Sequence, residues 1–225
     1  MKKVLFGIMA TAIVGTANAQ SKFEGLYGQV GVGYESVNPS YSNSSFTVSG
    51  VGTAPINTSI NSSNGFTGVV TVGYMRTITK DFLLGIGAEY SPIAGQKANY
   101  SGSVLGTSLG NGSYNKENSY NIFISPATPI GSDGLLYGKV GYTGASIKDT
   151  FGSSSTTANF TGYSFGLGYK QIISGGFYGF GEFNYMSYGD KTERSSATIA
   201  GYTVTSSITS NANAHNFIAG IGYRF

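Results

Sequence analysis

The sequence contains no cysteine, a single histidine and few charged side chains. The absence of cysteine among the 225 residues excludes disulfide bonds, thiolate metal sites and cysteine nucleophiles. With one histidine only scattered carboxylates remain as metal ligands, so we expect no metal centre and no cofactor. Charged residues make up 10% of the chain, and no basic cluster interleaves with exposed aromatics, which argues against nucleic-acid binding.

Glycine and aromatic residues are abundant instead. The chain has 35 Gly, 17 Tyr and 14 Phe. Disordered chains are poor in aromatics and rich in net charge, so this composition indicates a folded protein.

The first 19 residues have the pattern of a secretory signal peptide. Lys2 and Lys3 precede an apolar stretch over residues 4–15, which is too short to span a bilayer. The small residues Ala17 and Ala19 then form the expected cleavage site. We therefore predict a cleaved signal peptide over residues 1–19 and a mature domain over residues 20–225; the alternative is an uncleaved membrane anchor.

Beyond residue 19, apolar side chains alternate with small or polar ones, as in strands that turn every second side chain toward lipid. Eight such segments occur, at residues 26–34, 66–74, 82–91, 120–125, 136–143, 163–170, 177–185 and 216–225. A soluble barrel or sandwich would bury its apolar faces, yet here the opposite faces carry Gly, Ser, Thr and charges, too polar for a core. We predict an all-β fold, an eight-stranded antiparallel transmembrane up-and-down β-barrel.

The connections between these segments differ in length. Those near residues 75–81, 127–134 and 171–176 are short and contain turn formers, whereas those near residues 36–64, 92–117, 145–159 and 187–212 are long. Short periplasmic turns and long extracellular loops are the expected asymmetry of an outer-membrane barrel. We therefore expect four long extracellular loops, with some strands continuing above the membrane as a protruding sheet.

Aromatic side chains should ring both membrane interfaces of such a barrel. With strand directions set by the loops, every strand has an outward aromatic at its extracellular end, and most have one at the periplasmic end. The extracellular ring is Tyr34, Phe66, Tyr90, Tyr120, Tyr142, Tyr163, Tyr185 and Phe217, and the periplasmic ring is Tyr74, Phe82, Tyr169, Phe177, Tyr223 and Phe225.

The inward positions carry glycines, which make room for larger neighbours such as Tyr27, Phe123 and Tyr137. They also carry four charges, Glu89, Lys139, Glu182 and Arg224, with Glu35 and Lys170 nearer the rims. Isolated charges are costly in a narrow lumen, so we expect a hydrogen-bonded network. The network either fills the barrel and holds it shut, or acts as the gate of a small pore.

These features resemble the OmpA/OmpX-type eight-stranded outer-membrane barrels, including the Ail and opacity-protein relatives. The most specific part of the resemblance is the end of the last segment, where Tyr223 and Phe225 look like the signal read by the barrel-assembly machinery. The resemblance implies location in the Gram-negative outer membrane, contact with membrane lipid and lipopolysaccharide, transit by periplasmic chaperones and recognition by the assembly machinery. It does not imply one function, because a shared scaffold hosts many.

We expect a monomeric structural and surface-interaction barrel, whose loops bind an extracellular protein or a cell-surface target. The alternative is a small or gated porin-like channel for ions or small solutes. A remote alternative is a lipid A-modifying enzyme, which needs a histidine with a partner nucleophile or acid at the outer rim. His215 lies at that rim but lacks an adjacent serine, so we predict no enzyme activity and no catalytic residue.

Overall fold

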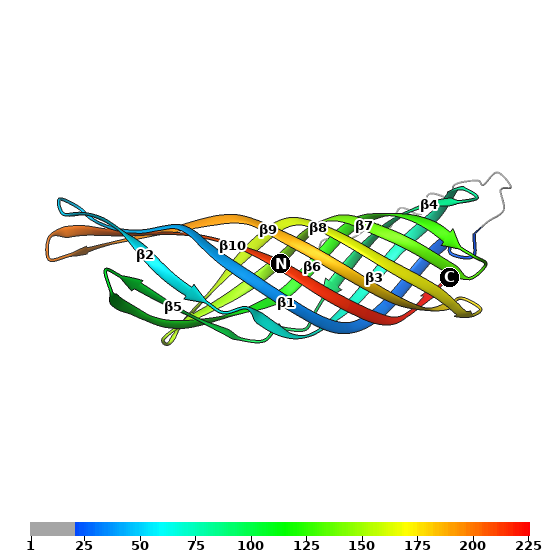
Figure 1. The fold of residues 1–225 in the computed structure, drawn as a ribbon, viewed down its shortest axis with the longest axis horizontal. Coiled ribbons are helices and arrows are strands. Elements are labelled where there is room, and N and C mark those ends of the chain that lie inside the picture. Colours follow the sequence, from blue (N-terminus) through cyan, green and yellow to red (C-terminus); the bar gives the residue numbers. More distant parts are fainter. Residues whose placement is uncertain (1–20) are drawn as a thin grey trace, which may run out of the picture.

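The computed structural model describes residues 21–225, so the predicted signal peptide with Ala17 and Ala19 lies outside the described residues. The described chain consists of antiparallel strands (Figure 1). In chain order they are β1 (Gly25–Val48), β2 (Gly52–Ile60), β3 (Ser63–Thr79), β4 (Phe82–Ser91), β5 (Ala98–Val104), β6 (Thr107–Ile130), β7 (Gly134–Phe151), β8 (Ser154–Ser174), β9 (Phe177–Ile199) and β10 (Tyr202–Arg224). Within these residues no helix has the length and apolar character needed to cross a membrane.

Eight of the strands close into a ring. Their order is β10, β9, β8, β7, β6, β4, β3 and β1, and β1 pairs back onto β10. This closing register begins at Tyr27 opposite Arg224 and continues up the whole of β1. The predicted eight-stranded up-and-down barrel is therefore confirmed.

The two ends of the ring differ as the loop lengths predict. At one end the strands are joined by Lys80–Asp81, by residues 131–133 and by Gly175–Gly176, and the first and last strands also start and finish there. We call this the short-turn end. At the other end the chain continues far beyond the ring (Figure 1).

The four long connections are not loops, and this part of the sequence prediction was wrong. Strands of the ring continue through most of residues 36–48, 107–117, 145–159 and 187–212, and β2 and β5 are two further strands with no place in the predicted eight. The strands meet in tight turns such as Leu105–Gly106 and Ala200–Gly201, in which both residues have positive φ. That geometry suits the twist of a two-residue hairpin. The expectation of a protruding sheet therefore describes these segments better than the expectation of loops.

The protruding part, here called the extension, has its own strand order. It comprises β2, β5 and the distal parts of β1, β6, β7, β8, β9 and β10, paired in the order β9, β10, β1, β2, β5, β6, β7, β8. The pairing of β8 with β9 stops at Gly162 and Tyr188, although both strands continue. The described strands thus form a closed ring that includes the short-turn end. In the extension they form a curved sheet in which β8 and β9 are not paired, and we call this gap in the pairing the seam.

A β-bulge marks the place where β6 changes partner. Its first part, from Thr107 to Tyr114, pairs with β5, and its pairing with β4 begins at Ser119. Between these two stretches the register shifts around Asn118, which has a positive φ of 47° and accepts a 3.0 Å hydrogen bond from the Tyr90 hydroxyl. Bulges re-aim a strand locally, which lets β6 leave the ring wall for the extension.

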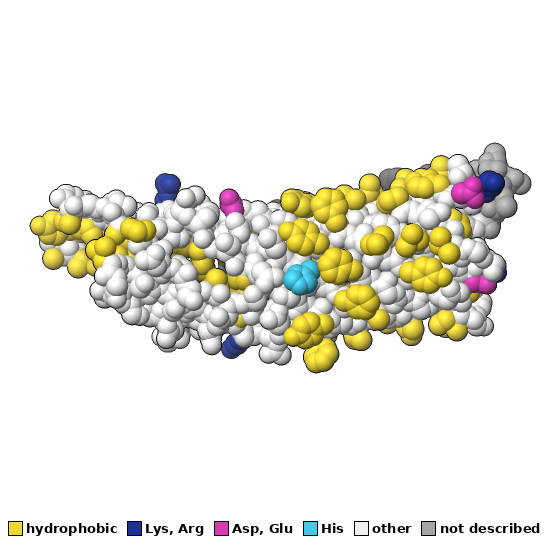
Figure 2. Space-filling view, viewed as in Figure 1, with side chains coloured by type: hydrophobic (Ala, Val, Ile, Leu, Met, Phe, Trp, Pro, Cys, Tyr) yellow, Lys and Arg dark blue, Asp and Glu magenta, His cyan; other side chains and the backbone are white. Residues whose placement is uncertain are grey.

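The outer face of the ring is apolar. All fourteen aromatic residues predicted for the two rings are exposed, from 36% for Tyr185 to 78% for Phe66. Several touch across strands: the Tyr34 and Phe66 rings lie 6.0 Å apart and the Phe177 and Tyr223 rings 4.8 Å apart. Figure 2 shows hydrophobic side chains gathered over the ring, while the extension is largely covered by uncharged polar groups.

Candidate functional site

The lumen near the short-turn end is filled by aromatic side chains that lie on glycines. Each aromatic residue stands directly opposite a glycine of the neighbouring strand, and a Cβ on that glycine would overlap the ring. The pairs are Tyr27 with Gly73, Phe123 with Gly87, Tyr137 with Gly168 and Tyr178 with Gly222. Glycine therefore provides the space that lets four large rings close a narrow cross-section.

A charged network crosses the middle of the lumen. The Lys139 ammonium donates to Glu182 Oε1 at 2.8 Å and to Glu89 Oε2 at 3.0 Å, and its side chain is 1% exposed. The Tyr137 hydroxyl donates to Glu182 Oε2 at 2.8 Å. A buried lysine between two carboxylates is compensated only while all three groups stay in place.

The network continues to the distal rim of the ring. Asn184 Nδ2 donates to Glu182 and to Asn216 Oδ1, and Asn216 Nδ2 lies 3.4 Å from Glu35 Oε2. The chain of contacts ends at Lys116, whose ammonium lies 2.7 Å from Glu35 Oε2 and is almost completely buried. The sequence prediction missed Lys116 because it falls in a segment expected to be a loop, although its position before the alternating stretch of β6 was a usable signal.

Arg224 was predicted to join the lumen charges, and the structure does not bring it there. It lies at the short-turn end, where its Nη1 is 3.4 Å from the carbonyl oxygen of Glu24. Lys170 is inside the lumen, but it faces aromatic rings and not a carboxylate. Its ammonium lies 3.8 Å from the centre of the Tyr27 ring and 4.9 Å from that of Tyr178, a cation–π arrangement. The observed network therefore unites Glu89, Lys139 and Glu182, adds Lys116 and leaves Arg224 out.

His215 lies on the outer surface at the edge of the apolar band, where it is the single cyan side chain in Figure 2. It is opposite Ser36 on β1 and Tyr185 on β9. Glu35, a carboxylate on the neighbouring strand β1, is buried on the lumen side. The structure thus separates the only histidine from that carboxylate by the wall of the barrel.

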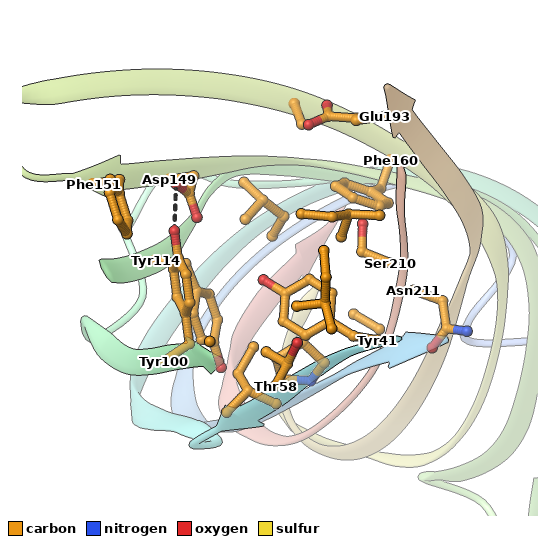
Figure 3. Close-up of a pocket in the computed structure, with 18 of the residues that line it drawn as sticks. Tyr41, Thr58, Tyr100, Tyr114, Asp149, Phe151, Phe160, Glu193, Ser210 and Asn211 are labelled. Atoms are coloured by element: carbon orange, nitrogen blue, oxygen red, sulfur yellow. Dashed lines mark hydrogen bonds between the residues drawn. The ribbon is translucent and has the colours of Figure 1, made fainter. Parts of the chain in front are cut away.

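A hollow with a volume of about 350 Å³ lies inside the extension (Figure 3). Two of its lining residues, Val37 and Ala212, belong to a buried cluster that also contains Ala145, Met186, Tyr188 and Ala214. Its walls come from β1, β2, β5, β6, β7, β8, β9 and β10, and most of the lining side chains are aliphatic or aromatic. A volume of this size is at the lower end of the range for small-molecule sites.

Tyrosines and two carboxylates supply the polar groups of this cavity. Tyr41, Tyr100 and Tyr114 come from three strands, and the Tyr100 hydroxyl donates to Asp149 Oδ1 at 2.9 Å (Figure 3). Burial raises the pKa of Tyr41 to about 12 and that of Tyr114 to about 12. Burial also raises the pKa of the Asp149 carboxyl, an effect that the Tyr100 hydrogen bond opposes. The phenols therefore stay neutral around neutral pH, and the negative charges of the cavity are those of its carboxylates.

Comparison with known proteins gives a family and a fold. The family model described as outer membrane protein beta-barrel domain matches residues 6–225. No curated protein sequence matches the chain. Among solved structures, the chain is similar to the outer membrane protein OprG from Pseudomonas aeruginosa, with a TM-score of 0.60, 15% identity and coverage of 91% of this chain and 98% of that one.

Two further solved structures share the barrel more loosely. The attachment invasion locus protein Ail of Yersinia pestis, solved with the heparin analogue sucrose octasulfate, has a TM-score of 0.42 and 16% identity, over 90% of this chain and 99% of that one. The outer membrane protease OmpT of Escherichia coli has a TM-score of 0.48 and 8% identity, over 93% of this chain and 99% of that one. At these identities the similarity concerns the fold alone.

Proposed function

Because the chain belongs to the family of outer membrane protein beta-barrel domains, we propose that it is a closed barrel that presents the extension as a binding surface on the outside of the cell. It is an integral protein of the Gram-negative outer membrane. Barrels of this class turn their short connections toward the periplasm, so the extension faces outward. The two aromatic rings then lie at the two membrane interfaces, where they contact lipid and lipopolysaccharide.

The contrast between a filled lumen and an open extension carries this proposal. Within the ring, four aromatic residues and the Lys139 ion pairs occupy the cross-section. In the extension, the same strands surround a cavity of about 350 Å³ with an apolar lining. A channel needs an open lumen within the ring. A protein that binds an extracellular partner needs an accessible cavity or surface in the part that faces that partner, which here is the extension.

The partners of such a protein follow from its location. Periplasmic chaperones and the barrel-assembly machinery receive the unfolded chain, and the machinery reads Tyr223 on the last strand and Phe225 directly after it. The folded barrel is a monomer in this proposal, because the ring closes on its own and presents its apolar face to lipid. The extracellular target is a protein or another cell-surface molecule.

The first experiment tests closure. The protein is refolded in detergent, run on a gel with and without boiling, and then inserted into a planar bilayer. We expect a heat-dependent gel shift without steady conductance, and the same result for Lys139→Met wherever that variant still shows the gel shift, because the aromatic rings still fill the lumen. Steady conductance that rises in Lys139→Met would replace the proposal with a gated channel.

The second experiment tests orientation and uses the lack of cysteine. Leu105→Cys places one thiol at the tip of the extension, where Leu105 is 83% exposed. Asp81→Cys places one thiol in a turn at the short-turn end. A membrane-impermeant maleimide added to intact cells should label the first variant and spare the second until the cells are lysed. Labelling of Asp81→Cys on intact cells would show that the short-turn end faces outward, which would refute the proposal.

A further inference from the structure

The cavity of the extension contains two carboxylates within a mostly apolar lining. Asp149, on β7, lines it with an oxygen held by Tyr100, and Glu193, on β9, lies on its wall. No lysine or arginine lines the cavity, and among the described residues no ion pair includes Asp149. Glu193 Oε1 lies 3.8 Å from Lys191 Nζ, and the Glu193 side chain is mostly exposed, so its charge is compensated by the lysine and by solvent. The uncompensated charge is that of Asp149.

Aromatic rings surround the same space. Tyr41 and Tyr100 pack edge to face with their ring centres 6.3 Å apart, and Tyr114, Phe151 and Phe160 come from the neighbouring walls. Figure 3 shows these rings around the hollow, with Asp149 beside the tyrosines. Ring faces attract cations, and they do so more strongly when water is excluded. Aromatic faces and a carboxylate therefore favour the same kind of ligand.

We propose that the cavity binds a small organic ammonium compound, with the positively charged nitrogen near Asp149 and an apolar body against the lining of β2, β8 and β10. The volume of about 350 Å³ accommodates a body the size of one aromatic ring with a short chain. A neutral apolar molecule would leave the Asp149 charge unpaired, and an anionic one would be repelled by both carboxylates.

This inference does not depend on whether the lumen conducts. It adds a ligand class to the outward-facing extension, and a failure of amine binding leaves the gel-shift and conductance results unaffected. Conversely, if the barrel conducts but the cavity still binds amines selectively, the proposal of a closed lumen is refuted and the proposal of an amine site stands.

The test compares three ligands of nearly equal size, phenethylamine, phenethyl alcohol and phenylacetate, by isothermal titration at about pH 8, where the carboxylate is charged and the amine largely protonated. The protein is held in phosphatidylcholine nanodiscs, so that no detergent competes for the cavity. We expect phenethylamine to bind at least about tenfold more tightly than phenethyl alcohol, and phenylacetate to bind most weakly.

Three variants locate the site. Asp149→Asn should lower the affinity for phenethylamine about tenfold and leave that for phenethyl alcohol unchanged. Ala158→Trp, which fills the cavity from β8, should abolish binding of both. Asp81→Asn removes the same charge at the short-turn end and should change nothing.

Equal affinity for the amine and the alcohol, no binding of any ligand, or unchanged amine affinity in Asp149→Asn would each overturn the proposal. A gel shift checks that every variant is folded. Should Asp149→Asn fail to fold, the ligand series on the unsubstituted protein still decides between a cation site and a merely apolar hollow.

Discussion

The ring and the extension share six strands, but they place their apolar side chains on opposite faces. In the ring, most large apolar side chains point outward to lipid, and the interior holds charges, amides and aromatic rings together with a few aliphatic side chains such as Leu83 and Ile218. In the extension, the apolar side chains point inward to the cavity, and the exposed face carries pairs of hydroxyls such as Thr192 with Thr209 and Ser196 with Thr205. Each part thus turns its apolar side away from water. The ring is surrounded by lipid, so its apolar side chains point outward, whereas the extension is surrounded by water, so its apolar side chains point inward.

The strands make this change by switching which alternate positions are apolar. On β1 the apolar residues are Val30, Val32 and Tyr34 in the ring, then Val37 and Tyr41 in the extension. Even positions face outward as far as the register shift between Ser42 and Ser45, so the apolar pattern moves from even to odd where the strand passes from the ring into the extension. Strand β10 does the same in reverse order, from the lining residues Ile208 and Ala212 to Phe217 and Ile221 on the outer face.

The buried ion pairs of the ring give the largest expected effect. Lys139→Met leaves Glu89 and Glu182 charged without a compensating cation, and we expect it to destabilise the barrel by about 3–5 kcal/mol. The measurement is urea unfolding in lipid vesicles, followed by the gel shift. Combining Lys139→Met with Glu89→Gln and Glu182→Gln removes all three charges and should recover most of the loss. A triple variant as unstable as the single one would show that the lysine acts through packing and not through charge.

The seam should appear as a sharp difference in amide exchange within single strands. On residues 154–161 of β8 and 190–199 of β9, alternate amides face the seam without a ladder partner. We expect these amides to exchange on the order of 100-fold faster than amides of the same strands below Gly162 and Tyr188. Hydrogen exchange read by NMR is the measurement. Uniform protection along β9 would mean that the extension is closed like the ring.

The glycines beneath the lumen aromatics should tolerate no side chain. Gly168→Ala puts a methyl group into the Tyr137 ring, and we expect a loss of about 1–3 kcal/mol in the free energy of unfolding. Gly181→Ala is the matched control, because a Cβ at Gly181 has no neighbouring atom within 4 Å. Equal effects of the two substitutions in urea unfolding would refute the close packing of ring on glycine.

The smallest effect concerns the extension and depends on pH. Burial raises the pKa of Asp149 in the folded protein, so the native state holds its proton to a higher pH than the unfolded state does. Stability should therefore fall as pH rises from the ordinary titration range of an aspartate through the raised value. The groups facing Asp149 are Tyr100, Tyr41 and Glu193. Neither phenol titrates in that range.

Because Asp149 is only half-buried, we expect this change to be below about 1 kcal/mol. Its measurement is the difference in urea midpoint between the unsubstituted protein and Asp149→Asn, at about pH 4 and about pH 7. The Asn variant should lack the dependence. A stability that rises with pH relative to the variant would contradict the sign.

Much of the ring could be predicted from the sequence because alternation is a local property. The eight segments, the three short turns and the outward aromatics such as Tyr34 and Phe217 follow from which positions are apolar. The sequence also predicted that inward glycines make room for larger neighbours such as Tyr137, and Gly168 does so. The switch in apolar positions along β1 was also present in the sequence, and it would have separated the extension from true loops.

The charged lumen was only partly foreseeable. Inward position identified Glu89, Lys139 and Glu182, but it also suggested Arg224, which lies too near the short-turn end to reach them. Lys116 meets Glu35 from 81 residues away in sequence, and no local pattern pairs two such residues.

The sequence by itself determined that this protein is a membrane barrel, because the choice between lipid and water is made residue by residue along each strand. Tertiary structure alone decided that β2 and β5 replace β3 and β4 in the extension, that β8 and β9 part at Gly162, and that Asp149 meets the rings of Tyr41 and Tyr100 around one cavity. The physical reason is that these features depend on which strands become neighbours. That choice is made by the closure of the whole sheet and not by any single segment.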